Sequence, residues 1–146
     1  MHLANEPGFD DTRNLQPKRF GIVRPRLLFN LSSILEASTG FALLVAPRFV
    51  IELLLGGTLD PVGVAVTRVL GIALVAVGAA GWESPNGGPS HASRVGLCIY
   101  NLGAAIVLAT AATIAGLHGV LLWPVAGVHA LFGIGIVWVL LKPPAD

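Results

Sequence analysis

A chain of 146 residues has the length of one domain. With 54% hydrophobic and only 12% charged residues, and a mean hydropathy of +0.78, it is too apolar to cover the surface of a soluble protein. Its net charge of +1 gives no sign of a nucleic-acid-binding surface. We therefore expect an integral membrane protein.

Residues 1–26 form a polar segment that contains three prolines and no apolar run of the kind found in secretory signals. We interpret this segment as a cytoplasmic N-terminal arm that is disordered when the protein is alone. Apolar residues nevertheless recur along the arm, which would suit docking on a partner. They are Leu3, Phe9, Leu15, Phe20 and Ile22.

The first predicted membrane span covers residues 27–46. At 1.5 Å per residue, twenty residues cross a hydrocarbon core of ~30 Å. Pro47 and Arg48 end this span, since proline and charge both stop a buried helix. Residues 49–55 are too few to cross the membrane, and Glu52 interrupts them, so they predict a short helix lying in the interface.

Three more apolar stretches follow, at residues 62–82, 95–116 and 120–141. A segment rich in Pro, Gly, Ser and Asn separates the first two, and a very short turn separates the last two. The sequence therefore predicts an all-α protein, with a four-helix up-down transmembrane bundle over residues 27–142 and a C-terminal tail at 143–146.

The basic residues predict the orientation of the bundle. Four spans place most of them on one face of the membrane and Arg48 on the other. Both termini should therefore be cytoplasmic, with Trp82 and Trp138 near the cytoplasmic interface and Trp123 near the opposite one. The basic residues on the first face are Lys18, Arg19, Arg24, Arg26, Arg94 and Lys142.

Small residues recur at helical spacing in the later spans, where they allow close contact between helices. These faces could serve contacts inside the bundle or with a second protein. The candidate packing residues are Gly63, Thr67, Gly71, Ala105, Ala109, Ala126 and Ala130.

Each span carries one strongly polar residue: Glu36, Arg68, Asn101 and His129 in chain order. Such residues are costly in hydrocarbon and are expected to face protein or water. Glu36 and Arg68 lie at similar depths on successive helices, which predicts an ion pair, with Asn101 and His129 completing a polar network.

Three interpretations of this network stay open. It could be a structural network that fixes the register of the helices. Glu36, alone or with His129, could carry protons or bind a cation. One haem ligand could come from His129, although His118 lies in a turn and offers a poor second ligand. The sequence predicts no catalytic residues, no metal site and no enzyme activity, and the single cysteine, Cys98, excludes an intrachain disulfide.

Four segments, TGFALLVAPRFV, TRVLGIALVAVGAAGW, YNLGAAIVLA and LLWPVAGVHALF, resemble small four-helix bacterial membrane proteins and, distantly, the DoxX-like class. The resemblance covers residues 27–141. It implies a protein of the bacterial inner membrane that serves as an accessory partner of a larger redox or energy-converting complex, and it transfers no catalytic residue.

The sequence-based expectation is thus an accessory or scaffolding subunit that contacts membrane lipid and a larger complex or further copies of itself. Any pigment would be contacted through that partner. The first alternative is a small proton-coupled transporter or channel centred on Glu36. The second is a haem- or quinone-associated membrane protein.

Overall fold

The structure of the protein, a computed structural model, describes residues 25–83 and 88–142. Within these ranges all regular structure is helical, and it consists of five helices. The predicted C-terminal tail and all but the last two residues of the predicted N-terminal arm lie outside the described residues. Four of the helices are long and apolar enough to cross a membrane, which confirms the predicted fold class.

The first two helices are α1 (Pro25–Val45) and α2 (Pro47–Leu55). Pro47 ends the first and begins the second, because a helix tolerates the missing N–H of proline in its first turn but not in its interior. At the end of α2, Gly56 adopts the left-handed conformation (φ 73°) and donates its backbone N–H to the Glu52 carbonyl at 2.8 Å. The short helix predicted at residues 49–55 is therefore present.

The third helix, α3 (Pro61–Gly81), begins at a capping residue: the Asp60 carboxylate accepts a hydrogen bond from the Gly63 backbone N–H at 2.6 Å. The helix α4 (His91–Thr113) is capped in the same way by Ser90. It starts four residues before the predicted 95–116, because the cap lies ahead of the apolar run. The last helix is α5 (Leu122–Leu141).

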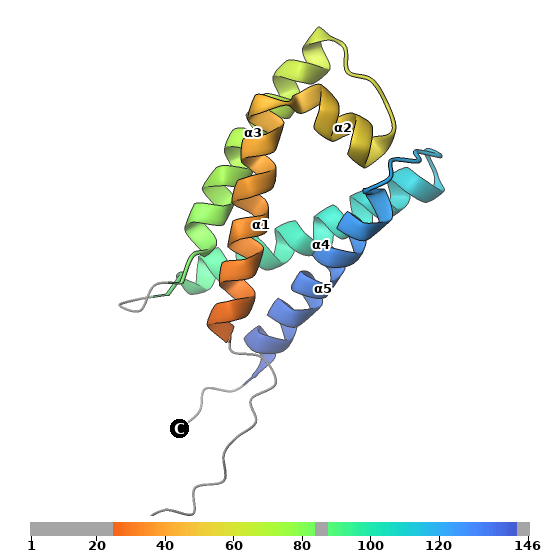
Figure 1. Ribbon diagram of the computed structural model, residues 1–146. Helices are drawn as coiled ribbons and strands as arrows, with labels where there is room; N and C mark the ends of the chain where they lie inside the picture. The colour runs from red at the N-terminus through yellow and green to blue at the C-terminus, as the bar shows by residue number, and fades with distance from the viewer. Residues whose placement is uncertain (1–24, 84–87, 143–146) are drawn as a thin grey trace, which may run out of the picture.

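The four long helices form two antiparallel pairs (Figure 1). α1 packs against α3, and α4 packs against α5, whereas contacts between the two pairs are fewer. Figure 1 shows the pairs diverging towards the end of the bundle that carries α2. The start of α1 and the end of α5 lie together at the opposite end, as an up-down arrangement of four spans requires.

The α1–α3 contact is so close that the backbones touch. A Cβ atom on Gly40 would lie 2.5 Å from the Gly71 carbonyl oxygen and 2.8 Å from the Val75 nitrogen. A Cβ atom on Gly78 would lie 2.6 Å from the Ser33 carbonyl oxygen. Small side chains thus provide the close packing that apolar burial cannot supply within lipid.

Only some of the predicted packing residues are buried in contacts between helices. Thr67 and Gly71 are buried in the α1–α3 contact, and Ala126 is buried on α5. Gly63 instead lies against its own capping loop, next to Asp60 and Leu59. The others, Ala105, Ala109 and Ala130, are partly buried.

The main apolar core joins both helix pairs at the end of the bundle opposite α2. Phe29 of α1, Leu97 and Cys98 of α4, and Ile136 of α5 are buried together. At the other end, α2 contacts the loop before α5, where the Leu121 N–H donates to the Leu53 carbonyl at 2.9 Å. α2 therefore connects the two helix pairs where they diverge.

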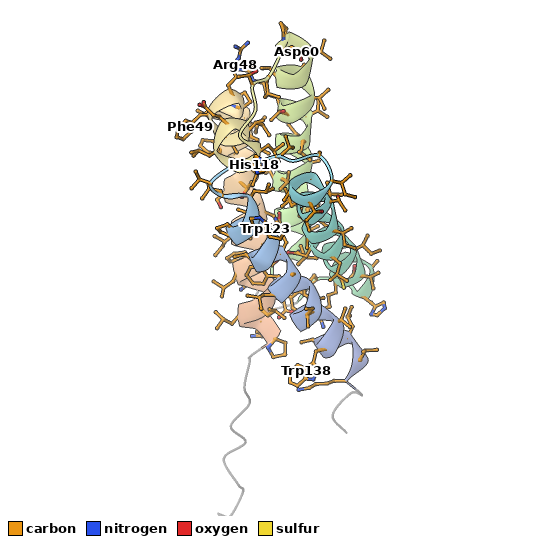
Figure 2. All side chains as sticks on the ribbon, turned by 90° about the vertical axis from the view of Figure 1, so that its right-hand side faces the viewer. Arg48, Phe49, Asp60, His118, Trp123 and Trp138 are labelled. Atoms are coloured by element: carbon orange, nitrogen blue, oxygen red, sulfur yellow. The ribbon has the colours of Figure 1, made fainter. Side chains whose placement is uncertain are left out.

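Two exposed tryptophans lie at different heights along α5 (Figure 2). Trp123 is at the start of α5, towards the end that carries α2, and Trp138 is near the opposite end. The Lys142 ammonium lies 3.3 Å from the centre of the Trp138 ring.

Candidate proton and ligand site

Three of the four predicted polar residues meet inside the bundle: Glu36 from α1, Asn101 from α4 and His129 from α5. Glu36 and Asn101 are completely buried, and His129 is 5% exposed. Because α1 and α5 belong to different helix pairs, this cluster lies at the contact between the pairs.

Asn101 has the contacts of a structural residue. Its amide nitrogen Nδ2 donates to the Leu97 carbonyl at 2.9 Å and to the Ser32 hydroxyl at 3.1 Å. A backbone carbonyl can only accept, so these contacts fix which end of the amide is nitrogen. The oxygen Oδ1 is then the end that faces His129.

The orientation of Asn101 assigns the proton on His129. Nδ1 of the imidazole lies 3.1 Å from the Asn101 oxygen Oδ1, which only accepts, so Nδ1 carries the hydrogen. In the neutral ring the other nitrogen, Nε2, is then a hydrogen-bond acceptor. It has no hydrogen-bond partner among the described residues.

Glu36 differs from Asn101 in its hydrogen bonding. Neither carboxylate oxygen has a hydrogen-bond partner within the described part of the chain. The nearest basic group is Nδ1 of His129, 3.6 Å from Oε1, and the Tyr100 side chain also lies close to the carboxyl group. A buried acid that only fixed helix register would be fully hydrogen-bonded, because an unsatisfied buried polar group is costly.

Two further residues belong to the site and were not predicted as part of it. Ser32 accepts the hydrogen bond from Asn101 and lies one helical turn before Glu36. Tyr100 contacts His129 edge to face, with ring centres 5.7 Å apart. The spacing of Ser32 and Glu36 along α1 was a usable sequence signal.

The predicted ion pair between Glu36 and Arg68 is not formed. Arg68 is exposed and lines a groove with Arg48 at the α1–α2 corner. The reason is the rotation of α3: Thr67 and Gly71 face α1, and the next residue on a helix points about 100° away. The partner of Glu36 is His129 instead.

A pocket of about 280 Å³ adjoins the cluster beneath α2. Its walls are mostly apolar, with the hydroxyls of Ser38 and Thr39 on α1 and the ring of His129 on α5 as polar exceptions. The apolar walls include Leu35 of α1, Leu53 and Leu54 of α2, and Val125 of α5. The pocket thus extends from the point where the helix pairs diverge to His129.

A second polar cluster, also not predicted, lies at the opposite end of the bundle. It connects the segment that follows α3 with α1 and α4. The Glu83 carboxylate, 4% exposed, lies 2.9 Å from the Arg94 guanidinium and 3.9 Å from that of Arg26. The Asn30 side chain bonds both the backbone N–H and the carbonyl of Glu83. The Glu83 carboxylate and the Asn30 amide are both paired, and only Nε of Arg94 has no hydrogen-bond partner among the described residues, so we interpret this cluster as structural.

These features define a four-span membrane protein with a buried acid that has no hydrogen bond among the described residues and lies beside His129, which lines a pocket. Comparison of the chain with protein-family models, curated proteins and solved structures gives no match. Among the described residues, no three His, Cys, Asp or Glu side chains converge on one point.

Proposed function

We propose that the protein is a small proton-coupled membrane protein centred on Glu36 and His129, which binds an apolar molecule in the pocket beneath α2. The observation that carries this proposal is the Glu36 carboxylate, fully buried and without a hydrogen bond among the described residues. Intramembrane acids of this kind are typical of proton pathways. The proposal corresponds to the first alternative drawn from the sequence.

The cluster has the connectivity of a proton relay. A ligand O–H or N–H can donate to Nε2 of His129, while the hydrogen on Nδ1 lies between the Asn101 and Glu36 oxygens. If Nε2 takes a proton that enters through the pocket, the Nδ1 proton passes to an ionised Glu36 and the ring stays neutral. Asn101 holds the ring in the tautomer that this transfer needs.

The pocket sets the class of ligand. Its walls favour an apolar body, and its size, about 280 Å³, limits that body to one or two rings or a short chain. The acceptor at Nε2 favours a ligand with a hydroxyl or N–H group. An alcohol, phenol or secondary amine on an apolar frame has both properties.

A matched pair of probes tests the ligand class. We expect 2-naphthol to bind the detergent-solubilised protein about five- to tenfold more tightly than 2-methoxynaphthalene, which cannot donate a hydrogen bond. Titration calorimetry against the same micelles without protein measures both affinities. Val125→Trp, which fills the pocket, should abolish binding of both probes, whereas Thr110→Ala on the exposed side of α4 should leave it unchanged.

Glu36→Gln separates proton coupling from binding. In vesicles that contain a pH-sensitive dye, 2-naphthol should cause proton movement with the unmodified protein and none with the folded Glu36→Gln variant. Equal proton movement with both proteins would contradict the role of Glu36, and equal affinity for the two probes would contradict the role of Nε2.

The second candidate function is the accessory subunit of a larger bacterial membrane complex. It is favoured by glycines on α4 and α5 that nothing covers: a Cβ atom on Gly96, Gly103 or Gly127 would meet no atom within 4 Å. A partner helix could approach the backbone there. Native electrophoresis after mild-detergent extraction should then show co-migration with larger subunits, which Gly103→Leu should abolish, whereas a monomer band would contradict it.

We propose that the protein lies in a bacterial inner membrane with both termini on the cytoplasmic side, and the position of the basic residues supports this orientation. Arg26, Arg94 and Lys142 lie at the end of the bundle where α1 begins and α5 ends, and Arg48 lies at the other. A reporter active only in the cytoplasm should be active when fused after residue 146. It should be inactive when inserted after Gly57.

A further inference from the structure

A second hollow lies outside the site described above, at the corner where α1 passes into α2. This groove, of about 340 Å³, is lined by both Arg48 and Arg68, together with Pro47, Phe49 and Val64. Both arginines are exposed, and neither makes an ion pair with a carboxylate in residues 25–83 or 88–142. Two positive side chains from different helices therefore share one groove.

The depth of Arg68 favours an anionic partner. It is the eighth residue of α3, so its Cα lies about 10 Å along the helix from Pro61, within an apolar span. A guanidinium at this depth extends towards the nearer interface. Arg48 lies at that end of the bundle, near the start of α3 (Figure 2). Two like charges in one groove repel each other unless an anion lies between them.

The backbone at the groove also favours an anion. The groove contains the first turn of α2, a helix of nine residues whose N-cap, Ala46, provides no side-chain cap. The first backbone hydrogen bond there runs from the Val50 N–H to the Ala46 carbonyl. The N–H groups of Arg48 and Phe49 precede it, and such groups at a helix N-terminus bind phosphate together with nearby arginines.

Within the described part of the chain, two carboxylates occur at this end of the bundle, and neither neutralises the groove. Asp60 accepts the hydrogen bond from the Gly63 N–H as the cap of α3. Glu52 is exposed and lies one turn after Arg48 on α2. Neither is within 4.0 Å of an arginine side chain.

We propose that this groove binds the phosphate of an anionic phospholipid. Val45, Val64 and the exposed ring of Phe49 border the two guanidinium groups, so an acyl chain can lie on apolar surface while its phosphate lies between the arginines. A zwitterionic headgroup would bring its ammonium group towards the same two cations. Phosphatidylglycerol should therefore bind better than phosphatidylcholine.

The test uses the full chain in phosphatidylcholine vesicles that contain a trace of spin-labelled phosphatidylglycerol or spin-labelled phosphatidylcholine. Electron paramagnetic resonance measures the fraction of each lipid that the protein immobilises. We expect a preference for phosphatidylglycerol that falls about two- to fivefold in Arg48→Gln and in Arg68→Gln, and that vanishes in the double variant.

Lys142→Gln is the matched control, because it removes a cation at the opposite end of the bundle and should leave the preference unchanged. Thermal unfolding selects folded variants, and Arg68→Lys, which keeps the charge, should retain part of the preference. An unchanged preference in the folded double variant would overturn the proposal. Displacement of phosphatidylglycerol from the unmodified protein by millimolar inorganic phosphate would also overturn it, in favour of a free-phosphate site.

Discussion

The two contacts that α1 makes inside the bundle differ in almost every respect. Against α3, its small residues bring two backbones into direct contact, with Gly40 opposite Gly71. Against α4 and α5, it presents Glu36 to a polar cluster with an adjoining pocket. The first contact has no room for a larger side chain, whereas the second contains a buried carboxyl group without a hydrogen bond among the described residues and has space for a ligand. We infer that the first contact stabilises the fold and that the second forms the functional site.

The largest effect should come from adding one carbon to the closely packed contact. Gly40→Ala is expected to lower the free energy of unfolding by about 2 kcal/mol, because the Cβ meets backbone atoms that cannot move aside. Gly103→Ala is the control: its Cβ meets nothing, and alanine favours the helix by about 1 kcal/mol. Thermal unfolding in detergent should thus move in opposite directions for the two variants. Equal shifts would remove the distinction between the contacts.

Within the polar cluster, Asn101 should matter more for stability than Glu36 does. Asn101→Leu removes interhelical contacts to Ser32 and His129 and a contact to Leu97 within α4. At ~0.6 kcal/mol for each interhelical polar contact, it should cost about 1–2 kcal/mol. Urea unfolding in mixed micelles would measure the loss. No loss of stability would show that the Asn101 network is dispensable.

The Glu83 cluster should contribute less. Glu83→Gln removes the charge that pairs with Arg94 and Arg26, and both arginines keep access to solvent, so we expect a cost of about 1 kcal/mol. A double-mutant cycle with Arg94→Gln isolates the pair. A coupling free energy near zero would mean that the ion pair adds nothing to the Asn30 contacts and the apolar core at this end of the bundle.

The smallest change in stability is expected for Glu36→Gln. This substitution keeps the shape of the side chain and removes an ionisable group that has no hydrogen bond among the described residues, so the free energy of unfolding should stay within about 0.5 kcal/mol or rise. The same unfolding measurement applies. A loss as large as that of Asn101→Leu would return Glu36 to a structural role.

The sequence was sufficient to predict the architecture, because span length, apolar composition and breaks such as Pro47 and Asp60-Pro61 act locally. It also contained a signal against the predicted ion pair. Since Thr67 and Gly71 were expected to pack against a neighbouring helix, the adjacent Arg68 had to point elsewhere.

The parts of the site that could not be predicted depend on how separate helices meet. The contact between Glu36 and His129 joins the first and last spans, and neither depth nor spacing shows which helix faces which. The pocket requires the position of α2 between the two helix pairs. Glu83 lies in a segment whose composition indicates only a loop, so its pairing with Arg94 had no local signal.

The most direct measurement of the central claim is the infrared difference spectrum of the protein between two pH values, compared with that of Glu36→Gln. Our account predicts that the unmodified protein shows a carboxyl C=O signal that is missing from the folded variant, and that 2-naphthol changes this signal. Identical spectra would show that Glu36 exchanges no proton, which would contradict a proton relay through His129.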